Sequence, residues 1–268
     1  MVMMRAESLF NRLVSQNACL VTVQATRGSV PREAGAWMVV FDTDTLGSIG
    51  GGHLEFQAIA QARHRLGGGT GEPVLRYPLG PALGQCCGGE VQLRFELVGA
   101  TDVDALQLRL AQQRTPLALF GGGHVGQALV QVLASLPLQL RWIDSRDQIF
   151  PADLPQHVVT EHSDPVQAAV PELARQSRVL IMSFSHAEDL EVVAACLLRQ
   201  RQHGDLPYVG LIGSKTKWAS FSHRLQSRGF TARELSHVTC PIGVAGISGK
   251  APEVIAVAVA AQILQTLP

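Results

Sequence analysis

The sequence carries no excess of charge of either sign. Its 268 residues include 22 Lys plus Arg and 22 Asp plus Glu, so the formal net charge at pH 7 is zero. Nucleic acids and anionic membranes attract basic proteins, and a neutral chain gives no general electrostatic reason to bind either of them. We therefore expect a protein that has neither nucleic acid nor a membrane as its partner.

Long apolar runs are also missing. A membrane-spanning helix needs about 20 consecutive apolar residues, whereas the most apolar stretch, residues 254–267, is rich in alanine and shorter than that. Charged residues at Arg5, Glu7 and Arg12 interrupt the N-terminal segment, which therefore does not resemble a secretory signal. The sequence thus predicts a cytoplasmic protein.

Cysteines are few, and none of them form a C-x-x-C pair. The five cysteines are odd in number, which argues against a disulfide framework and against a closed zinc site. Cys19 and Cys196 lie in apolar runs, where we expect small core residues. Cys86 and Cys87 instead lie in a glycine-rich loop, where a thiol is either reactive or ligating, or a partly buried structural residue.

The N-terminal part has the pattern of a small mixed α+β unit. Hydrophobic residues with helical spacing occupy residues 5–15 and 53–66, and β-rich or alternating runs predict strands at 19–26, 36–42, 73–77 and 90–98. We assign residues 1–99 to this N-terminal domain. Residues 100–115 are predicted to be a helix and linker.

The remaining residues, 116–268, alternate between strands and helices. Apolar strands are predicted at 117–120, 138–143, 158–159, 179–184 and 208–212, with helices between them and a last helix at 253–264. Such alternation indicates a parallel sheet with helices on both faces. The predicted fold class is therefore α/β: a C-terminal parallel sheet preceded by a smaller α+β domain.

A glycine-rich turn follows the first strand of this second part. Gly121-x-Gly123-x-x-Gly126 opens the next helix, and Asp144 ends the next strand. Glycines in this context allow a tight turn, close approach of a phosphate to the backbone, and close packing of helix on strand, which together indicate a Rossmann-type fold. The fold does not fix the ligand, because NAD(P) or any other phosphorylated molecule could use the turn.

A second glycine cluster precedes the predicted helix of the N-terminal domain. Gly50, Gly51 and Gly52 are followed by His53, and the run is either another phosphate cradle or a tight turn that needs positive φ. The nearby loop 27–35 carries two arginines, of which Arg32 is a candidate anion ligand because its planar guanidinium suits phosphate. A solvated connection is the alternative for this loop.

Polar residues also follow the fourth and fifth strands of the parallel sheet, at the edge where such folds bind ligands. His186 and Asp189 are candidates for the crevice, although a helix-capping role for Ser185 or His186 is equally compatible with the sequence. Ser214 is a candidate helix cap, and Lys215 a candidate phosphate ligand. The sequence contains no Ser-His-Asp order, H-E-x-x-H motif or Walker A motif.

Taken together, these segments resemble the XdhC/CoxI family of xanthine dehydrogenase accessory proteins. The resemblance covers nearly the whole chain and keeps the order of the family's motifs. It rests on residues 28–32, 47–52, 87–89, 120–126, 144–146, 185–189, 209–215, 241–243 and 252–253. Two segments depart from the family pattern: Asp144-Ser145-Arg146 replaces Asp-Pro-Arg, and Val244 to Ser248 lacks the usual acidic residue.

The resemblance implies a molybdenum cofactor (molybdopterin) chaperone. Such a protein binds the cofactor while a cysteine desulfurase replaces an oxo ligand by a sulfido ligand, and it promotes insertion into a xanthine dehydrogenase-type molybdoenzyme. Whether the chain is itself an enzyme is left open, with an accessory role favoured. A homodimer is also expected, because a small α+β module leaves apolar strands to be covered.

The predicted binding residues follow from the motifs and the resemblance. The cofactor's phosphate would lie at residues 50–53 or 122–125, and Cys87 is a candidate molybdenum contact. No catalytic residue is predicted. The full set of candidate cofactor-binding residues is Arg32, Gly50, Gly51, Gly52, His53, Cys87, Gly88, Gly121, Gly122, Gly123, His124, Val125, Gly126, Asp144, Arg146, His186, Ser214 and Lys215.

Two other functions compete with this one. An NAD(P)-dependent oxidoreductase would use Asp144 to bind the nicotinamide cofactor and a proton donor such as His186. A ligand-sensing or interaction module would carry no molybdenum and would tolerate Cys87→Ala.

Overall fold

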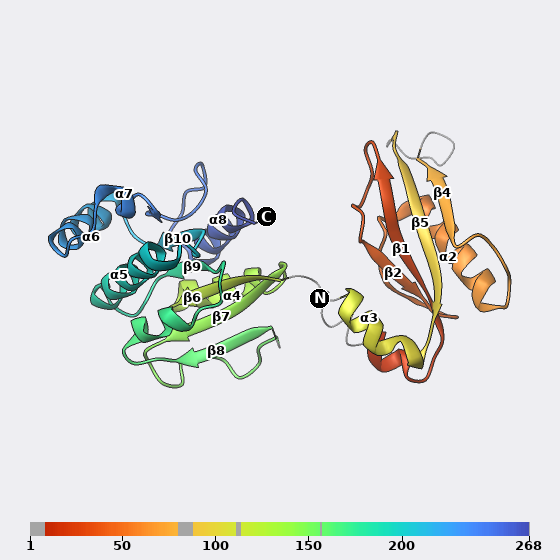
Figure 1. The fold of residues 1–268 in the computed structure, drawn as a ribbon, viewed down its shortest axis with the longest axis horizontal. Helices are drawn as coiled ribbons and strands as arrows, with labels where there is room; N and C mark the ends of the chain where they lie inside the picture. Colours follow the sequence, from red (N-terminus) through yellow and green to blue (C-terminus); the bar gives the residue numbers. More distant parts are fainter. Residues whose placement is uncertain (1–8, 80–87, 111–113, 156, 268) are drawn as a thin grey trace. The chain divides into compact units, whose positions relative to one another are not determined.

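The two strand patterns of the sequence form two separate sheets (Figure 1). A computed structural model describes residues 9–79, 88–110, 114–155 and 157–267. The chain divides into two units, Met1–Ala111 and Gln112–Pro268, and each is described by itself.

The first unit is built on a five-stranded antiparallel sheet in the order β3-β2-β1-β5-β4. Its long central pair aligns Ala18 with Val98 at one end and Arg27 with Glu90 at the other. The strands are β1 (Ala18–Arg27), β2 (Trp37–Val40), β3 (Thr45–Gly47), β4 (Val74–Pro78) and β5 (Glu90–Val98).

Each face of this sheet has its own hydrophobic core, because successive side chains of a strand point to opposite faces. Helix α2 (Gly52–Leu66) covers the face that includes Cys19 and Val21. Leu20 lies on the other face, with the helical residues 9–13 and with α3 (Val103–Leu110), which follows the short η2 (Ala100–Asp102). Cys19 is fully buried, which confirms the expectation of a small core residue, and this burial raises the pKa of its thiol to about 11.

The second unit contains a six-stranded parallel sheet in the order β11-β10-β9-β6-β7-β8. Its order reverses between β6 and β9, as in a Rossmann fold, which confirms the predicted fold class. The two-residue edge strand β11 was not predicted. The strands are β6 (Thr115–Phe120), β7 (Leu138–Asp144), β8 (Val158–His162), β9 (Arg178–Ile181), β10 (Tyr208–Leu211) and β11 (Val238–Thr239).

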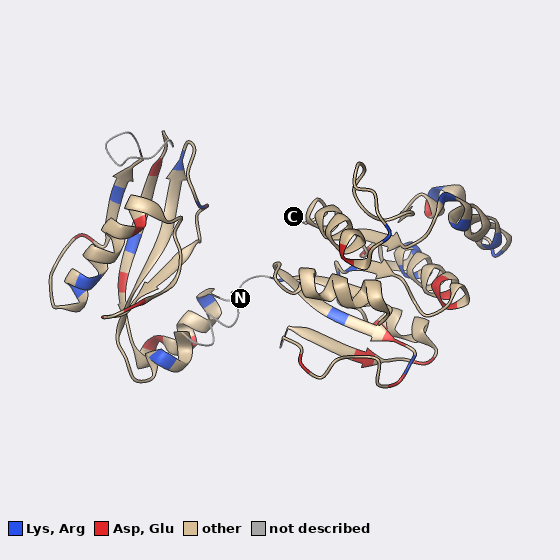
Figure 2. Cartoon of the chain, turned by 180° about the vertical axis from the view of Figure 1, so that it is seen from behind, with Lys and Arg blue, Asp and Glu red and all other residues tan. Residues whose placement is uncertain are grey.

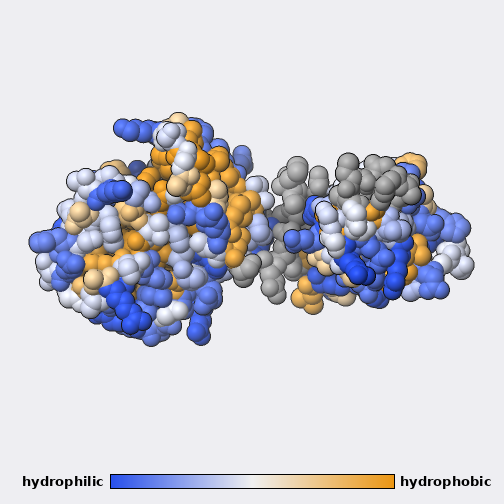
Figure 3. Space-filling model, turned by 90° about the horizontal axis from the view of Figure 1, so that it is seen from above, coloured by the Kyte–Doolittle hydropathy of each residue, from blue (hydrophilic) through white to orange (hydrophobic). Residues whose placement is uncertain are grey.

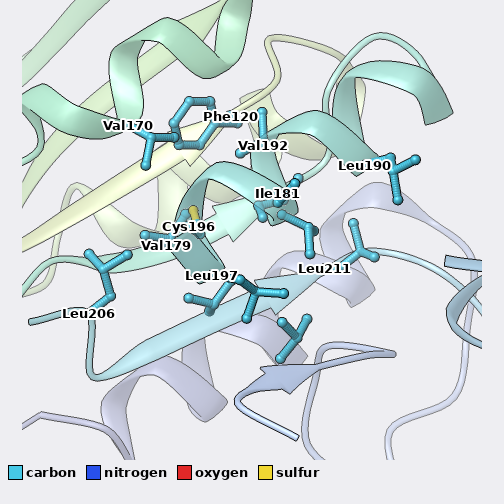
Figure 4. Packing of buried hydrophobic residues seen from close by; sticks show 14 of the residues in the cluster. Phe120, Val170, Val179, Ile181, Leu190, Val192, Cys196, Leu197, Leu206 and Leu211 are labelled. Atoms are coloured by element: carbon cyan, nitrogen blue, oxygen red, sulfur yellow. The ribbon is translucent and has the colours of Figure 1, made fainter. Parts of the chain in front are cut away.

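Helices cover both faces of the parallel sheet. Leu117 and Leu119 pack with α4 (His124–Leu133) and α8 (Pro252–Leu264), whereas Ala118 and Phe120 face the opposite core. The opposite core contains η3 (Val166–Glu172), α5 (His186–His203), α6 (Lys215–Ser227) and α7 (Ala232–Leu235). Figure 4 shows this core around Phe120, Ile181 and Cys196. Cys196 is fully buried, as predicted.

The surface has no segregation of charge by unit. Basic and acidic residues occur in both units (Figure 2). Figure 3 shows apolar surface on the second unit, where Ile247, Val257 and Leu264 are among the exposed large apolar residues. Within the described ranges, every helix is too short or too polar to cross a lipid bilayer.

A buried ion pair joins α5 to the segment before β10. Arg199 donates from Nε to Asp205 Oδ1 at 3.0 Å and from Nη2 to Oδ2 at 2.9 Å, and its Nη1 donates to the Val170 carbonyl at 2.7 Å. The hydrogen bond from Arg199 holds the pKa of Asp205 below its ordinary value. A lowered folded pKa means that this stabilisation is present above the unfolded pKa and is lost as the pH falls through the folded pKa.

Replacing Asp205 with Ala should therefore lower the free energy of unfolding at pH 7 by about 3 kcal/mol, because the Arg199 guanidinium is left buried without its carboxylate. Urea unfolding followed by far-UV circular dichroism measures this. Asp153→Ala, at an exposed position, is the control and should change stability by less than about 0.5 kcal/mol. The difference in the free energy of unfolding between wild type and Asp205→Ala should become smaller below about pH 4. Equal urea midpoints for the two variants at pH 7 would contradict the assignment.

Candidate functional site

The carboxyl edge of the parallel sheet brings together most of the candidate residues of the second unit. Ligands of such folds bind outside this edge, where the strand order reverses. The reversal lies between β6 and β9, which pair as neighbours with Phe120 opposite Ile181. Gly121 to Gly126 follow β6. Asp144 is the last residue of β7, and Arg146 lies two residues after it. His186 follows β9, and Ser214 with Lys215 follow β10.

The glycine turn after β6 shows two of the roles expected of it, the tight turn at Gly121 and close packing at Gly126, and leaves open space at Gly123. Gly121 has φ +122°, and a Cβ there would lie 2.0 Å from the Met182 carbonyl oxygen. A Cβ at Gly126 would lie 2.1 Å from the Gly121 carbonyl oxygen, so this glycine lets α4 pack closely on the turn. At Gly123, the N-cap of α4, a Cβ would meet nothing within 4 Å, and no side chain caps the helix. The first turn of α4 is therefore accessible to an anion.

Asp144 holds the turn in place from the end of β7. Its Oδ2 accepts a hydrogen bond from the Gly122 N–H at 2.5 Å and from Arg146 Nη2 at 2.9 Å, and its Oδ1 accepts from Arg146 N at 2.8 Å and Nε at 2.9 Å. Burial alone would raise the pKa of this carboxyl, which is 1% exposed, but the hydrogen bonds from Arg146 and Gly122 outweigh it and lower the pKa. Both oxygens are thus engaged within the protein.

Arg146 in turn stacks on an aromatic ring at the same edge. Its guanidinium carbon lies 4.6 Å from the ring centre of Phe184, in the loop that follows β9. The side chain of Arg146 is 32% exposed, and Phe184 is 64% exposed. Glu188 links the two loops, because it accepts from Ser145 Oγ at 2.9 Å and from the Phe184 N–H at 3.1 Å.

A second ion pair fixes the loops after β9 and β10. Asp189 accepts from the Ser183 N–H at 2.7 Å and from Lys217 Nζ at 2.6 Å, and Lys217 also donates to the Ile212 carbonyl at 2.9 Å. Asp189 is buried in this pair and does not present a free carboxylate to the crevice. Burial raises the pKa of the nearby Cys240 thiol, and Lys217 only partly opposes this effect.

The remaining candidates at this edge lie at the starts of α5 and α6. Ser185 and Ser214 are helix caps, since their hydroxyls accept backbone N–H bonds at 3.2 and 3.1 Å. His186 is exposed and lies edge-on to Phe221, with ring centres 6.3 Å apart. Lys215 is exposed in the first turn of α6. The sequence left Ser214 open as a helix cap or a ligand contact, and the structure shows that it caps α6.

The candidate loops of the first unit also meet one another. A Cβ at Gly50 would lie 2.6 Å from Pro31 Cγ, and one at Gly89 would lie 2.4 Å from the Ser29 carbonyl oxygen. Loops 28–32, 47–52 and 88–89 therefore lie side by side at one end of the antiparallel sheet. Arg32 and Gly88 are exposed there. Cys86 and Cys87 lie outside the described residues.

In contrast to the turn before α4, the turn before α2 contains its own anion. Glu55 Oε2 accepts from Ser48 Oγ at 2.6 Å and from the N–H groups of Ile49 and Gly51, each at 3.0 Å. The Gly50 N–H donates to Ser48 Oγ at 3.1 Å. Glu55 was not among the predicted residues, and its position in the first turn of α2 was the only signal that could have revealed it.

Beside this turn, His53 and Gly52 are exposed. The His53 ring stacks on Phe56 with ring centres 6.3 Å apart, and its Nε2 lies 3.1 Å from Gln57 Nε2. Both contacts lie along the exposed side of α2. In the described parts of the chain, His, Cys, Asp and Glu side chains form no cluster of three or more that could hold a metal ion.

Two substitutions in the α4 turn should have very different effects on stability. Gly121→Ala forces a methyl group onto the Met182 carbonyl at positive φ and should cost more than about 3 kcal/mol. Gly123→Ala, in the same turn, meets open space and should cost about 1 kcal/mol, the difference between Gly and Ala at an N-cap. Thermal unfolding of the second unit, followed by circular dichroism, compares them. Equal melting temperatures would show that the turn is not constrained in this way.

Glu55→Ala should destabilise the first unit by about 2 kcal/mol, because two backbone N–H groups and one hydroxyl lose their acceptor. Glu55→Gln keeps an oxygen acceptor and should lose less. Gln61→Ala, at an exposed position of the same helix, should be neutral. Urea unfolding of the three variants tests this, and a neutral Glu55→Ala would refute the role of Glu55.

Comparisons with known proteins agree with this architecture. Residues 117–263 match the model of the XdhC Rossmann domain, and residues 14–78 match the model of the XdhC and CoxI family. The chain is also 26% identical over 264 residues to the uncharacterized protein YqeB of Escherichia coli strain K12. That alignment covers 95% of this chain but only 44% of YqeB, so the chain spans less than half of that relative.

A solved structure shares the fold of nearly the whole chain. It is a crystal structure from Bacillus halodurans, described as a xanthine dehydrogenase, with a TM-score of 0.77 and 19% sequence identity. The match covers 97% of this chain and 95% of the other. The family models account for both units in the order expected from the motifs. The chain therefore belongs to the XdhC and CoxI family.

Proposed function

We propose that this protein carries the molybdenum cofactor as cargo and delivers it to a xanthine dehydrogenase-type molybdoenzyme. Family membership supports an accessory role. The observation that carries the proposal is the uncapped first turn of α4 at the point where the strand order reverses, with Arg146 beside it. Molybdopterin has a phosphate group, and a helix N-terminus of this kind suits phosphate.

The donors at this edge fit a phosphate. Gly122 N and Arg146 Nη2 donate to the same oxygen of Asp144, so the guanidinium lies next to the turn. A guanidinium has five N–H donors, and the contacts with Asp144 leave some of them for another acceptor. The turn before α2 is less suitable, because Ser48 and Glu55 already accept the N–H groups of Gly50 and Gly51, whereas in the α4 turn Asp144 accepts the N–H of Gly122 alone among the described contacts. We therefore assign the cargo's phosphate to residues 122–125 rather than to residues 50–53.

The metal end of the cargo needs little from the protein. Molybdenum arrives bound by the sulfur atoms of its own organic ligand, so a three-residue protein site is not required. Cys87 stays a prediction from the sequence for a metal contact, because a thiolate is a soft ligand and glycines follow the residue; it lies outside the described residues. While the cargo is held, a cysteine desulfurase partner would supply the sulfur of a terminal sulfido ligand; the replaced oxo ligand would leave as water, and a thiol reductant would supply the two electrons that reduce the persulfide sulfur.

Hydride transfer from NAD(P) is the alternative, and the state of Asp144 argues against it. In NAD-binding folds the acidic residue at this position accepts hydrogen bonds from ribose hydroxyls. Here both of its oxygens accept bonds from Gly122 and Arg146. Ribose binding would have to displace donors from a carboxylate that is 1% exposed.

The test is to measure the cargo directly. The protein is purified from cells that make molybdenum cofactor, and molybdenum and oxidised-pterin fluorescence are measured per chain. We expect nearly one pterin per wild-type chain and a clear loss in Cys87→Ala. Cys86→Ala is the matched control, since it removes a neighbouring thiol from the same loop, and it should retain the pterin.

Other outcomes would change the proposal in defined ways. Equal pterin content in all three proteins would keep the carrier function and remove Cys87 from the site. Wild-type protein without pterin or molybdenum, from cells replete with the cofactor, would overturn the carrier function. Binding of reduced nicotinamide, detected by a change in its fluorescence, would then favour the oxidoreductase.

A further inference from the structure

We propose that Phe184 is a stacking platform for a planar heteroaromatic ring whose phosphate lies at the first turn of α4, with Arg146 as the residue that positions the platform. The identity of the natural ligand rests on the proposed function, but the binding site itself does not. Ligands with this chemistry include a phosphorylated pterin and a mononucleotide. The inference assigns the recognition of the ring, which neither the glycine turn nor Cys87 provides.

Phe184 has the properties of a platform because it is exposed and yet held in place. It is 64% exposed although its ring is large and apolar. Arg146 contacts the ring from the edge of β7, with its guanidinium carbon 4.6 Å from the ring centre. Glu188 accepts the Phe184 N–H, which fixes the backbone at the start of α5. A rigid ring with much of its surface in solvent is suited to stacking on another aromatic ring.

Arg146 can position this ring because it is itself anchored. Two nitrogens of its guanidinium donate to the buried Asp144, and the same carboxylate accepts the Gly122 N–H. Asp144 therefore connects Phe184 to the glycine turn, because it binds Arg146 on one side and Gly122 on the other. Glu188 provides a second connection, since it bridges Ser145 beside Arg146 to Phe184. The platform and the phosphate position are thus parts of one hydrogen-bonded arrangement.

A hydroxyl at the same edge has no hydrogen-bond partner among the described residues. This hydroxyl is Ser183 Oγ, and it is buried. Because Phe120 lies opposite Ile181 in the β6–β9 ladder, Ser183 follows β9 at the level where Gly122 follows β6. Buried polar groups are normally hydrogen-bonded, so this hydroxyl leaves one hydrogen bond unmade at the edge to which we assign the ligand.

The experiment uses the full chain, purified from cells unable to make molybdopterin. Oxidised pterin phosphate, GMP and inorganic pyrophosphate are titrated separately by calorimetry into wild type, Phe184→Ala, Phe184→Trp and Phe56→Ala. We expect Phe184→Ala to lower the affinity for the ring-bearing ligands about tenfold, as loss of one stacking contact does. Its affinity for pyrophosphate should be unchanged. Phe184→Trp should restore the affinity. Phe56→Ala removes an equally exposed ring of the other unit and should have no effect.

Each alternative result has a defined meaning. The inference is overturned if Phe184→Ala binds the ring-bearing ligands as tightly as wild type does, if it loses pyrophosphate to the same extent, or if wild type binds none of the three. If wild type binds pterin phosphate more tightly than GMP, the ring that stacks on Phe184 is the pterin of the cargo. If it binds GMP more tightly, the ligand is a nucleotide. If pterin copurifies from cofactor-replete cells while Phe184→Ala binds normally here, the carrier function stands and only the platform fails.

Discussion

One buried carboxylate organises the ligand edge of the second unit. Asp144 accepts the Gly122 N–H and three hydrogen bonds from Arg146, so it sets the glycine turn and the guanidinium relative to each other. Because the two donors compensate its charge, the residue can remain buried and ionised. This carboxylate holds the α4 turn and Arg146, and through Arg146 it contributes to the position of Phe184, which Glu188 also holds.

The two glycine-rich turns show how similar sequences can differ in their hydrogen bonding. Both precede a helix, and both contain glycines at positive φ. The turns differ in how many N–H groups a side chain occupies: Glu55 accepts those of Ile49 and Gly51 before α2, whereas before α4 Asp144 accepts that of Gly122 and no described side chain accepts that of Gly123 or His124. N–H groups that a side chain already accepts need no ligand, whereas unoccupied N–H groups at the start of a helix are suited to an external anion.

The sequence predicted local features well and their connections poorly. The alternation of strands and helices and the spacing of Gly121, Gly123 and Gly126 were sufficient for the Rossmann-type fold. Ser214 could not be assigned from sequence, because capping and ligand binding use the same hydroxyl. The contact of Arg146 with Phe184 joins segments that are distant in sequence, and no local pattern reports it. Strand β11 has two residues and follows no periodicity long enough to detect.

The shortness of β11 has a consequence for how the molecule avoids unwanted self-association. An edge strand presents unpaired N–H and C=O groups that can recruit a strand from another molecule, and two residues offer very few of them. At the other edge, β8 is longer and exposes Val159, but it carries Glu161 in an ion pair with Arg141. A charged side chain on an edge strand opposes the docking of a foreign apolar strand. At one edge of the parallel sheet the short length of β11 opposes pairing with a foreign strand, and at the other edge the charged Glu161 of β8 does so.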